Sequence, residues 1–516
     1  MMENIDYDLR SIQEARELAR KGKVAANEIA NYNEEQIDKI LKNMVKVAEE
    51  NKVYLAKMAV EETGFGKVED KTFKNHMAST MVYDAIKDMK TIDVIDEDIE
   101  NKIISIAEPM GLVMGIVPST NPTSTAIFKS MIAIKSRNAI VFSPHPAALK
   151  CTTESIRLMN DAAVEAGAPI NIISGITTPS MEATNELMGH KDVAVIIATG
   201  GPGMVKSAYS SGKPALGVGA GNSPAYIEKT ANVEKAVKDI VASKTFDNGT
   251  ICASEQSVIV EECNRDQVIA EFKKHNCYFM TEDETKKVCQ LLFKNGHAMN
   301  AKFVGRTPQV IADAAGISIP GGTKILIGEQ KGVGDGYPLS FEKLTTVLAF
   351  YTVKDWHEAC ELSYKLLQNG LGHTMNIHTE DRDMVMKFSK KPASRILVNT
   401  GGSQGGTGAS TGLLPSFTLG CGTWGGSSVS ENVGPMHLIN IKKVAYGIKD
   451  CSTIAEEDNS SLNCTTNCGC NYESPAFYAA RSAAPNECNN ECNNKCDDDK
   501  VMKLMSELME AMKGAN

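Results

Sequence analysis

The chain has 516 residues, of which 42% are hydrophobic and 41 are glycine, so it is too long for one core and suits two or three packed domains. Its net charge of -10, with no basic stripe, argues against nucleic acid as a partner. No apolar run approaches the roughly 18 residues of a membrane helix, and the start, MMENIDYDLR, lacks the order of a signal peptide. We expect a cytosolic protein with no membrane partner and with reduced cysteines.

The first part of the chain predicts a layer of helices. Between Tyr7 and Ile86 the sequence is rich in Ala, Glu, Lys, Met and Leu, and apolar residues such as Ile37, Ile40 and Met44 recur at helical spacing. These helices are amphipathic, so we expect them to pack on another element.

From Leu112 the pattern changes to strands that alternate with helices. The predicted strands are Leu112–Val117, Ala139–Ser143, Ile170–Ser174 and Val193–Ala198. Helical stretches lie between them at 123–136 and 147–166. This alternation predicts a parallel sheet that is covered on both faces.

The loops after these strands are candidate binding sites, because parallel sheets bind ligands beyond the carboxyl ends of their strands. They read PSTNP at 118–122, SPHP at 143–146 and TGGPG at 199–203. TGGPG resembles a dinucleotide loop, in which glycines let backbone N–H groups approach a phosphate. Lys206 replaces the last glycine of that pattern, and no acidic residue follows before Glu228. An ordinary strand-to-helix turn therefore stays open.

A second α/β region runs from about Pro224 to Val433 and contains FDNGTICASEQ at 246–256. Its Cys252 follows an Asn-Gly turn and precedes the strand-like run Ser257–Val260. A free cysteine is more often a small buried hydrophobe than a reactive group. From the residues alone, Cys252 is only a candidate nucleophile.

The last part of the chain differs from the body in composition. Seven of the 14 cysteines lie between Cys451 and Cys496, without C-x-x-C pairs or a nearby histidine, so we expect no metal site. One face of the predicted helix at 498–514 is apolar, and a short helix on a polar linker needs a partner for such a face.

Three segments, in this order, resemble the aldehyde dehydrogenase superfamily: PSTNPTSTAIFKS (118–130), GVGAGNSPAYIE (217–228) and FDNGTICASEQ. SPHP, NGLGHTMNIHT (369–379) and GCGTWGGSSVSENVGPMHLIN (420–440) resemble its CoA-acylating branch, which includes the aldehyde dehydrogenase half of bifunctional aldehyde/alcohol dehydrogenases. The resemblance spans about residues 33–444.

The resemblance implies an α/β fold with a Rossmann-type NAD-binding domain, an α/β catalytic domain and a small β oligomerisation element. The implied boundaries are 1–91 and 112–222 for the NAD-binding domain, 92–111 and 434–446 for the oligomerisation strands, 223–433 for the catalytic domain, 447–497 for a flexible linker rich in Cys and Asn, and 498–514 for the tail helix. That tail helix is similar to encapsulation peptides of bacterial microcompartments. The resemblance implies a homo-oligomer, either a dimer or a tetramer. The tail helix implies a shell protein as a partner and a location inside a microcompartment. The alternative is that this helix folds back on its own oligomer.

The same resemblance implies the catalytic residues. Cys252 takes the position of the family nucleophile, and a thiol with a pKa near 8.5 is partly thiolate at neutral pH. Cys421, also in a glycine-rich stretch, is its rival and is interpreted as structural. Asn121 takes the position of an oxyanion donor, together with the backbone N–H of Cys252. Its own context, before Pro122, predicts a helix N-cap, and both roles can hold.

Cofactor residues follow from the same comparison of motifs. Ser143 and Pro144 stand about where hydrolytic relatives use a lysine for the adenosine ribose. This difference leaves ribose recognition, and with it the choice of NAD or NADP, open. Thr199, Gly200 and Gly201 match the loop near the pyrophosphate. Glu342 resembles the glutamate that touches the nicotinamide ribose, and a solvated surface acid is the alternative. Coenzyme A is implied as a co-substrate.

One absence points to the reaction. Hydrolytic relatives carry a glutamate in E-L-G-G-K-S-P, and aligning that segment with GNSP at 221–224 places Val218 at the glutamate position. Water needs a base to attack a thioester, whereas a thiol needs one less. We therefore expect oxidation of a small aldehyde, acetaldehyde before propionaldehyde, to acyl-CoA with NAD. The alternatives are a hydrolytic aldehyde dehydrogenase and a catalytically silent assembly protein.

Overall fold

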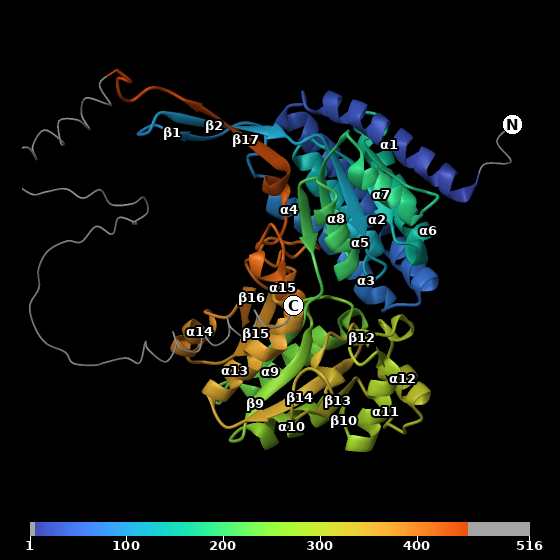
Figure 1. Ribbon diagram of the computed structural model, residues 1–516, viewed down its shortest axis with the longest axis vertical. Coiled ribbons are helices and arrows are strands. Elements are labelled where there is room, and N and C mark those ends of the chain that lie inside the picture. The colour runs from blue at the N-terminus through green and yellow to red at the C-terminus, as the bar shows by residue number, and fades with distance from the viewer. Residues whose placement is uncertain (1–5, 453–516) are drawn as a thin grey trace, which may run out of the picture. The chain divides into compact units, whose positions relative to one another are not determined.

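The computed structural model describes residues 6–452 (Figure 1). The chain divides into two units at residue 448, and the fold below is that of the first unit. No helix within residues 6–452 combines the length and the apolar character needed to cross a bilayer. From residue 453 onward, the predicted linker and the predicted tail helix at 498–514 lie outside the described residues. Docking of that helix to a shell therefore stays a prediction.

The predicted helical layer at the start of the chain is present. It consists of α1 (Tyr7–Ile29), α2 (Glu34–Thr63), α3 (Val68–His76), a π-helical turn η1 (Met77–Met81) and α4 (Val82–Ile86). A capping box between Asn33 and Gln36 starts α2, and Gly64, with a φ of 69°, ends it. The apolar face predicted around Ile37 and Met44 is buried.

The first sheet has five parallel strands in the order β5-β4-β3-β6-β7. Its strands are β3 (Leu112–Val117), β4 (Ala139–Pro144), β5 (Ile173–Gly175), β6 (Val193–Thr199) and β7 (Ala215–Val218). The helices between them are α5 (Pro122–Lys135), α6 (Leu149–Glu165), α7 (Met181–Gly189) and α8 (Pro202–Ser210). If these five strands are numbered 1 to 5 along the chain, from β3 to β7, their order across the sheet is 3-2-1-4-5. This is the strand order of a Rossmann-type sheet, and its switch point lies between β3 and β6.

The strand predicted at 170–174 is wrong in its first half. Ile170 is 74% exposed and Asn171 has a φ of 64°, so the chain turns there, and β5 begins only at Ile173. A left-handed residue cannot extend a strand, and the apolar run in the sequence hides that turn.

The second sheet has seven parallel strands in the order β10-β13-β14-β9-β8-β15-β16. They are β8 (Ser223–Ile227), β9 (Glu255–Glu261), β10 (Cys277–Met280), β13 (Ile325–Glu329), β14 (Val347–Val353), β15 (Gly372–His378) and β16 (Ala393–Val398). Its helices are α9 (Val233–Thr245), α10 (Arg265–Lys274), α11 (Glu282–Leu292), α12 (Pro308–Ala315), α13 (Trp356–Leu367), α14 (Arg382–Phe388) and α15 (Gly402–Gly406). A short antiparallel hairpin of β11 (Phe293–Lys294) and β12 (Ala298–Met299) lies between α11 and α12 in the chain.

A third, antiparallel sheet projects from the first α/β region (Figure 1). It joins β1 (Asp93–Asp98), β2 (Ile103–Pro109) and β17 (Ile439–Ala445), so a strand near the end of the described residues pairs with one that precedes β3. After Ile439, every residue of β17 is exposed. The predicted role of this sheet in oligomerisation stays a prediction. The predicted α/β fold class itself is confirmed.

Candidate active site

The loops that carry the candidate site residues lie at the carboxyl ends of the strands in one sheet and at the amino ends of the strands in the other. The segments 118–121 and 199–201 follow β3 and β6, so they lie at the carboxyl ends of the first sheet, at its switch point. Gly221, Cys252 and Glu342 instead precede β8, β9 and β14, at the amino ends of the second sheet. The rule that ligands bind beyond the carboxyl ends of parallel strands therefore holds for the first sheet only. The strand pattern in the sequence does not indicate that the second sheet contributes the amino ends of its strands.

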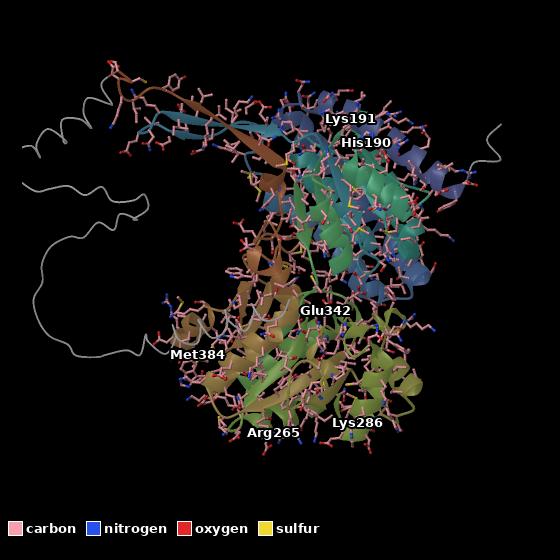
Figure 2. The ribbon with its side chains drawn as sticks, in the orientation of Figure 1. His190, Lys191, Arg265, Lys286, Glu342 and Met384 are labelled. Carbon is pink, nitrogen blue, oxygen red and sulfur yellow. The ribbon has the colours of Figure 1, made fainter. Side chains whose placement is uncertain are left out.

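These loops enclose one cavity of about 550 Å3. It is lined by every residue that the sequence proposed for catalysis or cofactor binding: Cys252, Asn121, Ser143, Pro144, Thr199, Gly200, Gly201 and Glu342. The volume lies within the range of roughly 300–1,000 Å3 that is usual for small-molecule sites. Figure 2 shows Glu342 where the region of the first sheet meets that of the second. The structure thus brings these residues together, while their individual roles stay predictions.

The turn between β6 and α8 has room for a dinucleotide. A Cβ atom placed on Gly201 or Gly203 would meet no atom within 4 Å, and one on Gly200 would meet only the side chain of Met204, at 3.8 Å. The backbone is therefore open to a ligand at the N-terminus of α8, where partial positive charge favours a phosphate. The residues present fit the phosphates of a nicotinamide dinucleotide.

The Cys252 loop begins with an unusual backbone. Asp247, Asn248 and Gly249 have φ values of 48°, 53° and 77°, so the predicted Asn-Gly turn is a run of left-handed residues. A Cβ atom on Gly249 would lie 2.7 Å from the carbonyl oxygen of Thr345, which restricts this position to glycine. The turn delivers Cys252, partly exposed, to the cavity wall.

The environment of Cys252 disfavours its thiolate. Burial, the charge of Glu342 and the neighbouring Cys421 together raise the pKa of the Cys252 thiol to about 12, against the Arg395 guanidinium, which lowers it. This direction is opposite to the expectation of a partly ionised thiol at neutral pH, because burial disfavours the charged form of Cys252. Attack on a carbonyl therefore requires loss of the thiol proton as the C–S bond forms.

Glu342 is no surface acid. Burial raises the pKa of its carboxyl group to about 7, and the Gly221 N–H, which donates to Oε1 at 3.0 Å, opposes that shift. The alternative of a solvated side chain is wrong, since Glu342 lines the cavity with Cys252.

Replacing Glu342→Gln is expected to speed alkylation of Cys252 by iodoacetamide at pH 8, in the absence of ligands. Glu342 is mostly ionised at that pH, and its charge raises the pKa of Cys252, so removing it enlarges the thiolate fraction. A fall of half to one pKa unit gives about a 3-fold to 10-fold faster reaction. Peptide mass spectrometry measures the rate, with exposed Cys263 as the internal reference. An unchanged or slower rate at Cys252 would contradict the electrostatic coupling.

Asn121 precedes α5, but its side chain does not cap that helix. Its Oδ1 accepts a hydrogen bond from Lys74 Nζ at 2.6 Å. Its Nδ2 donates to the Thr250 carbonyl oxygen and to Thr120 Oγ1, both at 3.2 Å. The predicted N-cap position before Pro122 is confirmed, but the side chain makes no capping hydrogen bond, because the carboxamide instead joins the loop that carries Cys252. Its oxyanion role stays a prediction.

Sequence reasoning missed two residues near Cys252: Arg395, whose charge acts on the thiol, and His373, which lies close to Gly221 beside the Cys252 carbonyl group. A Cβ atom on Gly221 would lie 2.1 Å from the Cys252 carbonyl oxygen and 3.3 Å from His373 Cγ, so only glycine fits between the two residues. Burial and the charge of Arg395 lower the pKa of His373 well below its usual range, which keeps the ring neutral. His373 lies in the segment NGLGHTMNIHT, which resembles the acylating branch, so the sequence could have indicated it. Arg395 lies within β16, outside every motif, so no sequence signal indicated it.

Two further residues have clear places. Cys421 is buried, its Sγ lies 3.6 Å from the Leu419 carbonyl oxygen, and it is not among the residues that line the cavity, which fits a structural thiol. Val218, the last residue of β7, is 2% exposed and lines the cavity with Cys252. The position that sequence alignment assigns to a missing glutamate is therefore an apolar part of the site wall.

A Rossmann-type sheet joined to a second parallel sheet, with a cysteine between them, defines the class of protein. Residues 5–301 match the aldehyde dehydrogenase family, and the chain belongs to that family, as predicted. It is 50% identical over 442 residues to the bifunctional aldehyde-alcohol dehydrogenase AdhE of Escherichia coli K12, covering 84% of this chain and 50% of AdhE. The chain thus spans about half the length of this curated relative.

Two other relatives match over nearly their whole length. A succinate-semialdehyde dehydrogenase (acetylating) of Clostridium kluyveri is 41% identical, covering 86% of this chain and 98% of the relative. The crystal structure of an acetylating aldehyde dehydrogenase from Geobacillus thermoglucosidasius is 54% identical, with a TM-score of 0.85, covering 86% of this chain and 99% of that one. Among aldehyde dehydrogenases, the chain is therefore similar to acylating enzymes, as predicted.

Proposed function

We propose that this protein oxidises a small, uncharged aldehyde to its CoA thioester, with acetaldehyde as the preferred substrate and propionaldehyde next. NAD, when bound, supplies the hydride acceptor. The observation that carries the proposal is the apolar, buried Val218 in the wall of the cavity that holds Cys252. The names of the acetylating relatives support the same reaction.

Cys252 and Asn121 have different roles in the proposed reaction. Cys252 Sγ forms a bond to the aldehyde carbon and releases its proton to the solvent, and the N–H groups of Asn121 Nδ2 and the Cys252 backbone stabilise the oxygen that becomes negative. Loss of hydride from that carbon leaves a thioester on Cys252. The thiol of CoA then takes the acyl group, and Cys252 regains a proton.

The fate of the thioester depends on what lies beside it. Water has a pKa near 15.7 and must be activated by a base before it attacks, whereas a thiol ionises far more readily. Val218 cannot accept a proton at the position where hydrolytic relatives carry a base. Glu342 lines the same cavity, so the proposal requires that its carboxylate, which accepts from the Gly221 N–H at 3.0 Å, does not activate water at the thioester. The thioester on Cys252 therefore persists until a thiol arrives, which conserves its energy in acyl-CoA.

The cavity also bears on the aldehyde. Its lining includes the apolar residues Ile251, Phe417 and Leu419, and among the described lining residues the only basic side chain is His145, whose pKa burial lowers. An aldehyde that carries a carboxylate or a sulfonate would thus lack a cationic partner here. This absence favours acetaldehyde and propionaldehyde over succinate semialdehyde.

NADH formation, followed by absorbance, tests the proposal with acetaldehyde, propionaldehyde and succinate semialdehyde, each with and without CoA. We expect turnover only with CoA, and kcat/KM highest for acetaldehyde. Equal turnover without any thiol would identify a hydrolytic enzyme. Absence of turnover with every aldehyde, with and without CoA, would favour the silent assembly protein. A preference for succinate semialdehyde would overturn the assignment of substrate but not of reaction.

A further inference from the structure

We propose that Lys74 is a positioning residue, whose ammonium group fixes the Asn121 carboxamide so that its N–H edge, and not its oxygen, faces the reacting carbonyl group. This inference rests on the proposed function, because it concerns the donor that stabilises the oxyanion. Lys74 lies near the end of α3, in the helical layer at the start of the chain, and is not among the residues that line the cavity.

The ammonium group of Lys74 has a hydrogen-bond acceptor for each of its N–H donors. It is 1% exposed, and an ammonium group has three N–H donors. These donors meet three acceptors: Asn121 Oδ1 at 2.6 Å, Asp247 Oδ2 at 2.5 Å and Thr250 Oγ1 at 3.1 Å. Lys74 thus ties the loop after β3, which carries Asn121, to the loop that carries Cys252.

These contacts leave the amide only one orientation. An ammonium group can only donate, so the atom of Asn121 beside Lys74 must be the oxygen. The carbonyl oxygen of Thr250 can only accept, so the atom beside it must be the nitrogen, as found at 3.2 Å. Rotating the amide by half a turn would set donor against donor and acceptor against acceptor. With Lys74 in place, the group that Asn121 offers near Cys252 is an N–H donor.

One N–H of this amide is available to a substrate. The bond to Thr250 holds one, and the other points to the hydroxyl group of Thr120, which also lines the cavity. A hydroxyl group can rotate away, so an oxyanion can take its place. The ammonium group on the opposite side polarises the amide and strengthens this N–H as a donor.

The charge on Lys74 is maintained by its surroundings. Burial lowers the pKa of Lys74 to about 8, and the nearby Asp247 carboxylate opposes that shift, so the side chain is mostly protonated at pH 7. Asp247 also accepts from Lys71 Nζ at 2.9 Å. Lys71 is the control: it is 2% exposed and binds the same carboxylate oxygen, and its other bond goes to the Thr120 carbonyl oxygen at 2.9 Å, not to the Asn121 carboxamide.

A double-mutant cycle at pH 7 tests the inference. NADH formation with saturating acetaldehyde, NAD and CoA is compared for wild type, Lys74→Met, Asn121→Ala and the double variant. Loss of one oxyanion donor lowers kcat by about 10²-fold to 10³-fold. We expect Lys74→Met to lower kcat by about 10-fold to 100-fold, and to add less than about 3-fold to the loss in Asn121→Ala. KM for NAD should change by less than about 3-fold.

Two measurements separate this role from a structural one. Alkylation of Cys252 by iodoacetamide needs no oxyanion donor, so its rate in Lys74→Met should stay within about 3-fold of wild type. Lys71→Met weakens the same ion pair and should keep kcat within about 3-fold. Equal losses in Lys74→Met and Lys71→Met, or a parallel fall in alkylation, would show that Lys74 only supports the loop and would overturn the inference.

Failure of the inference is distinguishable from failure of the proposed function. If wild type forms NADH with aldehyde and CoA, but the losses from Lys74→Met and Asn121→Ala multiply in the double variant, the inference is wrong and the function stands. If wild type has no activity that depends on CoA, the proposed function itself fails, and the inference falls with it.

Discussion

A Cys252→Ala variant is expected to lose NADH formation by about 10⁴-fold or more, because without the sulfur no covalent intermediate can form. Cys421→Ala provides the matched control, since it removes the other thiol that lies close enough to interact with Cys252 and Arg395. Cys421 is not part of the cavity lining, so this control should keep kcat within about 3-fold. Steady-state kinetics with acetaldehyde and CoA compares the two variants.

Mass spectrometry identifies the acylated residue directly. Wild type treated with acetaldehyde and NAD, without CoA, and quenched rapidly should carry an acetyl group on the peptide that contains Cys252. The same adduct should form in Cys421→Ala and be absent in Cys252→Ala. An adduct on Cys421, or full turnover by Cys252→Ala, would contradict the assignment of the nucleophile.

The order of the helices and strands could be predicted because local sequence determines it. The apolar runs of six residues at Leu112–Val117 and Val193–Ala198 form largely buried strands in the structure. The prediction failed where backbone conformation overrides side-chain hydropathy, as at Asn171 in its left-handed conformation. The packing of one sheet edge against a different edge of the next sheet depends on contacts between residues far apart in the chain, which no local pattern encodes.

The candidate site residues were found by motif, and they do line one cavity. What the motifs could not provide is the electrostatic environment. The high pKa of Cys252 arises from burial and from Glu342, a residue that precedes a different strand. Lys74 lies in the helical layer at the start of the chain and was not singled out from the sequence, yet it is 1% exposed and bonded to Asn121. Such features come from tertiary packing alone.

A Val218→Glu variant is expected to form NADH without CoA, at about 10²-fold the rate of wild type under the same conditions. Val218 is buried at the cavity wall, so a carboxylate there would have a raised pKa, nearer to neutral, which suits a base that activates water. A general base typically contributes about 10²-fold to 10⁴-fold, and an unoptimised one should lie at the lower limit. NADH formation and free acetate are both measured, since hydrolysis must yield them in equal amounts.

Val218→Gln is the control that isolates the base. Glutamine has nearly the size of glutamate and the same difficulty of burial, so any loss of stability or change of cavity shape should be similar in both variants. It cannot take a proton from water, and it should leave turnover dependent on CoA. If both variants hydrolyse equally, access of water to the thioester limits hydrolysis in this enzyme, and an apolar wall excludes water. If neither does, the stability of the thioester has a cause other than residue 218, and the argument from Val218 for acyl transfer fails.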